Sequence, residues 1–399
     1  HLLGSSFKPW GTLQQAIIGK PVNLHPFSNW AGVSTWHEQC CVAVAEMQFG
    51  KYETFAPGMA LKMERRYDES SGAMEYWVFL RDDVYWQPLS YDMFSESVAL
   101  APHFLKRHKV TAHDFKFYFD AIVNPYVQEP GAVALRTYFD SLEDILVIDD
   151  LTFVARWKTE DISQPDGSHT HLAKYISMQV TGGLRPLASF VYQYFPNGKK
   201  IVEDDTAKNT YKTSSVWAQN FSQHWARNII PSCGPWIFES MSDREIRFKR
   251  NAEFYNPLAV LVEETVEFFK DAPASLWQDF RADKLDIYTL QPEQQGELTN
   301  FLSSKEYKKQ ERKGRGIQRI EFVGRSYAYI GWNQTKPFFK NKKVRQALTL
   351  AIDRERIINQ YLNGLGAAIN GPFYPFSPDY DNTVQPWPYS QETARQLLR

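Results

Sequence analysis

The sequence has few cysteines and no long apolar run. Cys40, Cys41 and Cys233 are the only cysteines among 399 residues, too few for a disulfide-stapled fold or a four-ligand zinc site. One bridge from Cys40 or Cys41 to Cys233 fits an oxidising compartment, but buried free thiols are the simpler interpretation. Because no window reaches the roughly 18 consecutive apolar residues of a membrane span, we expect a soluble protein.

An excess of charge of either sign is also absent. The chain carries 45 basic and 46 acidic side chains, which gives a formal net charge of −1. A chain so close to neutrality has no global field that attracts nucleic acid or an anionic membrane. The densest basic run, residues 305–325, is interrupted by acidic side chains. It therefore predicts a solvated helix end and loop rather than a nucleic-acid surface.

The common catalytic signatures are missing as well. The sequence contains no G-x-S-x-G, no G-x-x-x-x-G-K-[ST] and no H-E-x-x-H motif. His103, His108 and His113 follow one another at five-residue steps, which place their rings on different faces of a helix. His169 and His171 would need a third ligand from elsewhere to hold a metal. We therefore expect no enzyme activity, no metal site and no cofactor.

The chain is instead large and rich in aromatic side chains. Its 399 residues, of which 43% are hydrophobic, predict two or three domains with ample core material. The 12 Trp, 21 Tyr and 27 Phe residues make up 15% of the chain. We expect most of them to pack in the core and some to line a surface or cleft that meets a ligand.

Local patterns predict a mixture of helices and strands. Residues 74–80 (MEYWVFL) carry apolar side chains on both faces, which is typical of a strand covered on both sides. Thr111 can cap a helix that begins near residue 112, and Asp114 favours its positive end. The remaining predicted elements are strand pairs within residues 145–157 and 236–248 and two helices within residues 344–362, the second ended by Gly364.

Four segments carry more specific motifs. They are residues 79–86 with 110–115 (FLRDDVYW and VTAHDF), residues 233–238 with 250–255 (CGPWIF and RNAEFY), residues 266–269 with 282–287, and residues 329–358 followed by Gly371-Pro372 and SQETARQLL. In this order they resemble the peptide and nickel class of extracellular solute-binding proteins. The resemblance covers most of the chain, and it is most specific in residues 329–358.

The resemblance implies an α/β fold of two lobes, the class II periplasmic-binding-protein type in its large three-subdomain form. Residues 1–35 and 175–265 would form the main sheet subdomain of lobe one, residues 36–174 its small extra subdomain, and residues 266–399 lobe two. Because the family continues beyond the position of Arg399, we expect the second lobe to be incomplete.

Two departures from the family pattern stand out. A long insertion replaces the usual short turn between Trp86 and Val110, and Cys233 stands where Thr or Ser is usual. The insertion falls in the small subdomain of lobe one, where we expect it to add to a surface.

The resemblance also implies a function without covalent chemistry. The protein would be the solute-binding subunit of an ABC importer, located in the periplasm or cell envelope after removal of a signal peptide. It would capture oligopeptides or peptide-like ligands by hinge closure and deliver them to a membrane permease. Metal chelates, peptidoglycan fragments and oligosaccharides remain alternative ligands. A carbohydrate hydrolase is an alternative of another class, which would need two carboxylates across a cleft.

The resemblance places the ligand contacts in two segments, the loop after the first strand and the strand near residue 330. The candidates are Ser28, Asn29, Trp30, Ala31, Gly32, Trp36, Tyr329, Trp332 and Asn333. Backbone groups of the loop could pair with an extended ligand as an added strand. Trp30, Trp36 and Trp332 could enclose apolar groups of the ligand or pack in the core. The hinge is expected at Val262, Val266 and Phe268.

Overall fold

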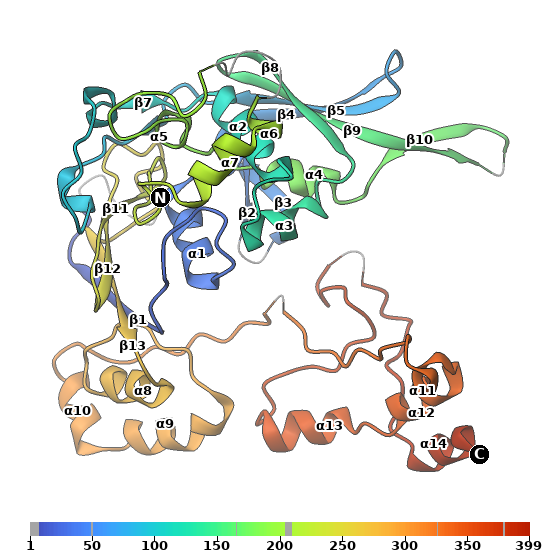
Figure 1. Cartoon of the computed structure of the whole chain (residues 1–399). Coiled ribbons are helices and arrows are strands. Elements are labelled where there is room, and N and C mark those ends of the chain that lie inside the picture. Colours follow the sequence, from blue (N-terminus) through green and yellow to red (C-terminus); the bar gives the residue numbers. More distant parts are fainter. Residues whose placement is uncertain (1–7, 49–50, 165, 204–209, 325, 378–379) are drawn as a thin grey trace. The chain divides into compact units, whose positions relative to one another are not determined.

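The chain forms two compact units, His1–Tyr288 (unit 1) and Thr289–Arg399 (unit 2) (Figure 1). The structure is a computed structural model that describes residues 8–399 except 49–50, 165, 204–209, 325 and 378–379. Among these residues, no helix combines the length and the hydropathy needed to cross a bilayer.

One sheet of unit 1 joins segments from opposite ends of the unit. Its four strands lie in the order β1 (Thr12–Ile18), β13 (Glu264–Lys270), β12 (Glu245–Arg250) and β11 (Trp236–Met241). β1 runs parallel to β13, and the other neighbours are antiparallel. The strand pair predicted within residues 236–248 is confirmed as β11 and β12. After β1, a loop of residues 19–30 leads to α1 (Ala31–Cys40).

The second sheet of unit 1 contains the strand predicted at residues 74–80. It has five strands, β10 (His169–Ala173), β9 (Thr152–Ser163), β5 (Ala73–Leu80) and β4 (Ala60–Asp68) in that order, with β8 (Leu142–Asp149) also paired to β9. β5 is confirmed as a largely buried strand, and its apolar content on both faces explains this burial. Two short strand pairs complete the unit, β2 (Ala45–Gln48) with β3 (Lys51–Pro57) and β6 (Tyr85–Trp86) with β7 (His108–Lys109).

Short helices complete unit 1 alongside these strands. They are α2 (Ala112–Val123), α3 (Pro130–Arg136), α4 (Ser177–Gly182), α5 (Ser189–Tyr192), α6 (Thr210–Thr213), α7 (Ser215–Ser222) and α8 (Pro273–Arg281). The insertion before residue 110 contributes the 3₁₀ turns η1 (Tyr91–Met93) and η2 (Pro102–Leu105).

Asp114 is the polar centre of unit 1. Only 2% of this residue is exposed, and it sits in the first turn of α2, which begins at the predicted position. Its Oδ2 accepts hydrogen bonds from the Thr111 backbone N–H (3.0 Å) and from Trp86 Nε1 (3.1 Å). Its Oδ1 accepts from the hydroxyl (2.6 Å) and the backbone N–H (3.2 Å) of Ser189. One carboxylate therefore joins α2, β6 and α5.

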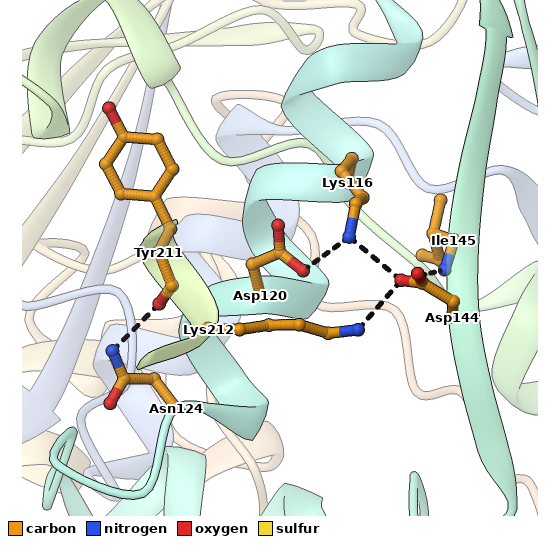
Figure 2. Close-up of polar contacts among 7 residues, drawn as sticks. All are labelled: Lys116, Asp120, Asn124, Asp144, Ile145, Tyr211 and Lys212. Atoms are coloured by element: carbon orange, nitrogen blue, oxygen red, sulfur yellow. Dashed lines mark hydrogen bonds and ion pairs between the residues drawn. The ribbon is translucent and has the colours of Figure 1, made fainter. Parts of the chain in front are cut away.

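A charged cluster fixes α2 to β8 and α6 (Figure 2). Lys116 Nζ lies 2.8 Å from Asp120 Oδ1 and 2.8 Å from Asp144 Oδ1, and Lys212 Nζ lies 2.9 Å from the same Asp144 oxygen. Burial raises the pKa of Asp120 to about 6, against the charge of Lys116. Burial also opposes ionisation of Asp144, but the two lysines together hold the pKa of Asp144 below its usual value.

Gly131 allows α3 to approach the loop before α1. Its N–H donates to the Phe27 carbonyl oxygen (2.9 Å), and an added Cβ would lie 2.5 Å from that oxygen. Because both contacts are backbone, α3 or the loop must move in Gly131→Ala, and we expect a loss of about 1–3 kcal/mol in the free energy of unfolding. Thermal and urea denaturation followed by circular dichroism measure it.

Gly296 provides the matched control. It is also the second residue of a helix, α9 (Gln295–Leu302), but nothing lies within 4 Å of a Cβ built there. Gly296→Ala is expected to leave stability unchanged or to raise it by up to about 1 kcal/mol. Equal stability of the two variants would contradict the contact assigned to Gly131.

Unit 2 is mainly helical. Besides α9 it contains α10 (Lys305–Glu311), α11 (Pro337–Lys340), α12 (Lys342–Leu350), α13 (Arg354–Arg356), the π turn η4 (Ile357–Tyr361), α14 (Gln391–Leu398) and the 3₁₀ turn η3 (Pro292–Gln294). The two helices predicted within residues 344–362 are confirmed. Ala347, Leu350 and Ala394 form a small buried cluster between α12 and α14.

The strand predicted near Tyr329 is not formed. The described residues between 315 and 333 have no regular secondary structure, and Tyr329 is 77% exposed. A strand needs a neighbour for its backbone N–H and C=O groups, and the described part of unit 2 has no other strand to supply one. The strand that the resemblance implied at this position is therefore absent from the described residues.

Candidate functional site

Unit 1 contains a pocket of about 310 Å³, at the lower end of the usual size range for small-molecule sites. Four segments form most of its walls: residues 26–29 of the loop before α1, one side of α1 that includes Ser34 and Glu38, residues 131–135 of α3, and residues 185–188, which lead into α5. Single residues from other segments complete the lining: Cys41, Trp86, Tyr118, Tyr192 and Pro231. Most of the lining is apolar, with a few polar groups among it. This composition is typical of a site that binds a small molecule or one part of a larger one.

The loop before α1 is held in shape by its own side chains. His25 Nδ1 accepts from the backbone N–H of Phe27 (3.2 Å), and the Ser28 hydroxyl accepts from the backbone N–H of Trp30 (3.2 Å). His25 Nε2 donates to the Phe221 carbonyl oxygen (3.2 Å), which fixes the loop to the end of α7. Burial lowers the pKa of His25 to about 3, so this histidine is neutral. The loop therefore presents Ser28 and Asn29 to the pocket on a fixed backbone.

Arg185, Glu38 and two tyrosines add further polar groups to the pocket. Arg185 Nη1 lies 3.3 Å from Glu38 Oε1. Its Nε and the hydroxyl of Tyr192 are both buried, and neither has a hydrogen-bond partner among the residues that the structure describes. Burial raises the pKa of both Tyr192 and Tyr118, so both phenols are neutral. Together with Ser28, Asn29 and Ser34, these residues give the pocket one guanidinium cation, one carboxylate, one amide and four hydroxyl groups.

The two unpaired donors have an energetic consequence. A buried donor without an acceptor costs about 1–3 kcal/mol, and native structures rarely leave such groups unmatched. A solute oxygen that accepts from Arg185 or Tyr192 would remove this cost on binding. The arrangement therefore suits a ligand with a carbonyl or carboxylate group.

Two of the residues predicted to bind ligand line the pocket, and three neighbouring candidates do not. Ser28 and Asn29 lie in its wall. Ala31 and Gly32 form the first turn of α1, and Trp30 precedes it. Gly32 is buried beneath the Trp30 ring, because a Cβ there would lie 2.4 Å from it.

Trp36 and the predicted hinge residues belong to the sheet side of unit 1. Trp36 is 1% exposed, and its Nε1 donates to Glu267 Oε2 (2.5 Å). Its surroundings are therefore those of a side chain packed in the core. Val266 is buried in β13 between β1 and β12, Phe268 follows it in the same strand, and Val262 lies just before the strand. The hinge stays a prediction.

The other three predicted residues lie in unit 2. Tyr329 is exposed, and Trp332 is half-buried and stacks on Phe339 with ring centroids 5.5 Å apart. Asn333 Oδ1 accepts from the backbone N–H (3.0 Å) and hydroxyl (2.7 Å) of Thr335, which forms a local turn. Their role in ligand binding stays a prediction.

Sequence reasoning missed Arg185, Glu38 and the two tyrosines of the pocket. The sequence does hold one signal for Arg185, which is a lone basic residue in the stretch GLRPLASFVY. A charge inside a run that is otherwise apolar needs a partner or a ligand if it is buried. The tyrosines gave no such signal among 21 in the chain.

A comparison with protein families decides the class of the protein. The family of bacterial extracellular solute-binding proteins, family 5 Middle, matches residues 54–399. The chain belongs to this family. Members of the family bind solutes and are not enzymes, so the hydrolase alternative is set aside. In the described part of this family member, no group of three or more His, Cys, Asp or Glu side chains is placed to hold a metal ion.

Relatives in the solute-binding family are similar over part of their length. The oligopeptide-binding protein AppA of Bacillus subtilis is 32% identical over 168 residues, which is 41% of this chain and 28% of AppA. Heme-binding protein A of Haemophilus influenzae is 40% identical over 82 residues, 21% of this chain and 15% of that protein. The chain therefore aligns with less than a third of either relative.

Solved structures confirm the expected fold. AppA in complex with a nonapeptide superposes with a TM-score of 0.66 at 18% identity, over 98% of this chain and 64% of AppA. NikZ from Campylobacter jejuni, in complex with Ni(L-His), superposes with a TM-score of 0.60 at 17% identity, over 97% of this chain and 62% of NikZ. The chain thus has the mixed α/β fold of class II periplasmic binding proteins and spans under two thirds of these structures.

Proposed function

We propose that this protein captures peptides or peptide-like solutes outside the cytoplasm and delivers them to the membrane permease of an ABC importer. The observation that carries the proposal is the pocket of unit 1, which Ser28 and Asn29 also line. There the buried donors of Arg185 and Tyr192 have no hydrogen-bond partner among the described residues. Family membership and the peptide-binding relatives support the same function.

The chemistry of the pocket fits part of a peptide. Each peptide unit has a carbonyl oxygen that can accept from Arg185 Nε or from the Tyr192 hydroxyl, and a terminal or side-chain carboxylate accepts more strongly. Phe27, Leu135 and Leu187 form apolar walls that suit a hydrophobic side chain. At about 310 Å³ the pocket would hold one portion of a peptide, not an entire oligopeptide.

Hinge closure belongs to the same proposal. Val262, Val266 and Phe268 lie before and in β13, the last strand of unit 1, and a small rotation there would move the chain that follows. Tyr329, Trp332 and Asn333 are proposed as further contacts. Because they lie in unit 2, variants of the unit 1 pocket do not test them, and their role needs substitutions at these three positions.

Replacement of Arg185 tests the pocket directly. Arg185→Met keeps the length and apolar body of the side chain but removes its donors. We expect it to weaken solute binding about 10- to 100-fold, because a hydrogen bond to a charged group contributes about 1.5–3 kcal/mol. Binding is measured by thermal shift against a library of di- to nonapeptides and then by calorimetry for the best ligand.

Arg65→Met is the control, because Arg65 is exposed on β4 and does not line the pocket. It removes the same charge and should leave affinity within about twofold. Unchanged affinity in Arg185→Met would contradict the proposed site. Failure of every peptide in the library would contradict the proposed ligand class.

A metal chelate is the second candidate ligand. The structural neighbour NikZ was solved with Ni(L-His), and the Arg185 cation suits the carboxylate of such a chelate as well as that of a peptide. Mass spectrometry of the material released from purified protein by mild denaturation separates the two. Peptide masses would support the first candidate, and a metal with an organic chelator would support the second.

A further inference from the structure

The three cysteines of the chain meet at the end of α1. The backbone N–H groups of Cys233 and Gly234 both donate to the Cys40 carbonyl oxygen, at 2.8 Å and 2.7 Å. A Cβ at Gly234 would lie 2.7 Å from the carbonyl carbon of Cys40, so the two segments touch through their backbones. All three side chains are buried and free. Two stretches far apart in the sequence thus bring their thiols into one small volume.

Only two of the three thiols face each other. The Cys41 thiol donates a hydrogen bond to the carbonyl oxygen of Pro231 (3.7 Å), two residues before Cys233, and the side chains of Cys41 and Cys233 interact with each other. The sulfur of Cys40 instead interacts with the Ser232 side chain and the Phe238 backbone. These side-chain contacts favour Cys41 over Cys40 as the disulfide partner of Cys233, an alternative that the sequence left open.

Cys41 is also the cysteine that lies at the wall of the pocket of unit 1. Cys233 does not line this pocket. The side-chain interaction with Cys233 lowers the pKa of Cys41 to about 6 against the effect of burial, and His37, one turn earlier in α1, acts in the same direction. Burial raises the pKa of Cys233. The pair thus places a thiol whose ionisation is favoured at the pocket wall, with a second thiol behind it.

We propose that Cys41 and Cys233 form a reversible disulfide, with a low-molecular-weight disulfide that enters the pocket as the oxidant. The Cys41 thiolate attacks one sulfur of the oxidant, forms a mixed disulfide and releases one thiolate. The Cys233 thiol then loses its proton and attacks the Cys41 sulfur, which releases the second half of the oxidant. Two protein thiols are oxidised and one small disulfide is reduced to two thiols.

The bond would connect the end of α1 to the segment that leads into β11. A disulfide between distant parts of a chain stabilises most, because it removes the most freedom from the unfolded state. The occurrence of the bond in the cell rests on the proposed location outside the cytoplasm, where disulfides persist. Its chemistry does not depend on solute capture and is testable in the purified protein.

The test is oxidation of the folded chain with glutathione disulfide. After denaturation and alkylation, intact mass is expected to show one free thiol in the oxidised wild type and three in the untreated protein. Oxidation should raise the melting temperature by about 5–10 °C, and dithiothreitol should reverse the increase. Three free thiols after native oxidation would overturn the proposal, and this readout depends on no variant.

Three substitutions assign the bond. No Lys or Arg separates Cys40 from Cys41, so trypsin leaves both in one peptide. Cys40→Ala should still lose both of its remaining thiols on oxidation. Cys233→Ala should instead stop at a mixed disulfide of Cys41 with glutathione, and Cys41→Ala should keep both of its thiols. Loss of the crosslink in Cys40→Ala would overturn the assignment.

Discussion

Replacement of Asp114 by alanine is expected to lower the free energy of unfolding of unit 1 by about 3–5 kcal/mol. The carboxylate accepts four hydrogen bonds, from the backbone and hydroxyl of Ser189, the backbone of Thr111 and the indole of Trp86. Its removal leaves these donors without an acceptor in a site that is closed to water. Urea denaturation followed by tryptophan fluorescence and circular dichroism measures the loss.

Two further variants make this test specific. Asp114→Asn keeps the shape of the side chain but turns one acceptor into an NH₂ group that must face a donor. We expect it to cost about 2 kcal/mol in spite of the conserved shape. Asp166→Ala is the control, because Asp166 is exposed and accepts only within its own turn, and it should cost under about 1 kcal/mol. A loss below 1 kcal/mol in Asp114→Ala would contradict the central role given to this carboxylate.

Acid is expected to destabilise unit 1 through two buried histidines. Burial lowers the pKa of His25 to about 3 and that of His224 to about 4, from an ordinary value near 6.5. Below pH 6.5 the unfolded chain therefore binds two protons that the folded chain does not, and stability falls as the pH falls. Between pH 7 and pH 5 each histidine is expected to remove about 2 kcal/mol.

Asp120 acts in the opposite direction over part of this range. With a pKa of about 6 in the folded chain, against an ordinary value near 3.8, it takes up a proton on folding between these values. Its contribution to stability is present below pH 3.8 and is lost as the pH rises through 6. Lowering the pH from 7 to 5 therefore recovers about 1 kcal/mol at Asp120, less than the two histidines remove.

A double variant isolates the histidines. Asn at positions 25 and 224 can still accept from the backbone N–H groups of Phe27 and Ala226, which now donate to the ring nitrogens. In His25→Asn/His224→Asn, the loss of stability between pH 7 and pH 5 should be smaller by about 4 kcal/mol than in the wild type. Urea denaturation at pH 7, 6 and 5 measures both slopes. Equal slopes would show that other groups cause the acid sensitivity.

The sequence predicted those parts of the fold that local chemistry decides. Residues 74–80 form a strand because their apolar side chains fit a sheet covered on both faces, and α2 begins after Thr111 because a cap and an acidic first turn stand there. The same chemistry could not reveal that Asp114 also bonds Trp86 and Ser189. Those partners come from other elements, and only the assembled fold brings them together.

The pocket was predicted only in part for the same reason. The motifs pointed to the loop of Ser28 and Asn29, but Arg185 and Tyr192 reach this loop from residues more than 150 positions later. Tyr329 shows the opposite error. The resemblance implied a strand there, and the strand is not formed because the described part of unit 2 has no partner strand for it.

The parallel pair of β1 and β13 imposes an order on biosynthesis. Thr12 and Glu264, which face each other in this pair, are 252 residues apart, and among the described strands β1 pairs with β13 alone. While the chain emerges from the ribosome, the backbone groups of β1 remain unpaired until almost all of unit 1 has followed it. Long-range closure of this kind is slow and leaves an edge open to aggregation. Nascent chains are therefore expected to depend on chaperone protection until residue 270 is available.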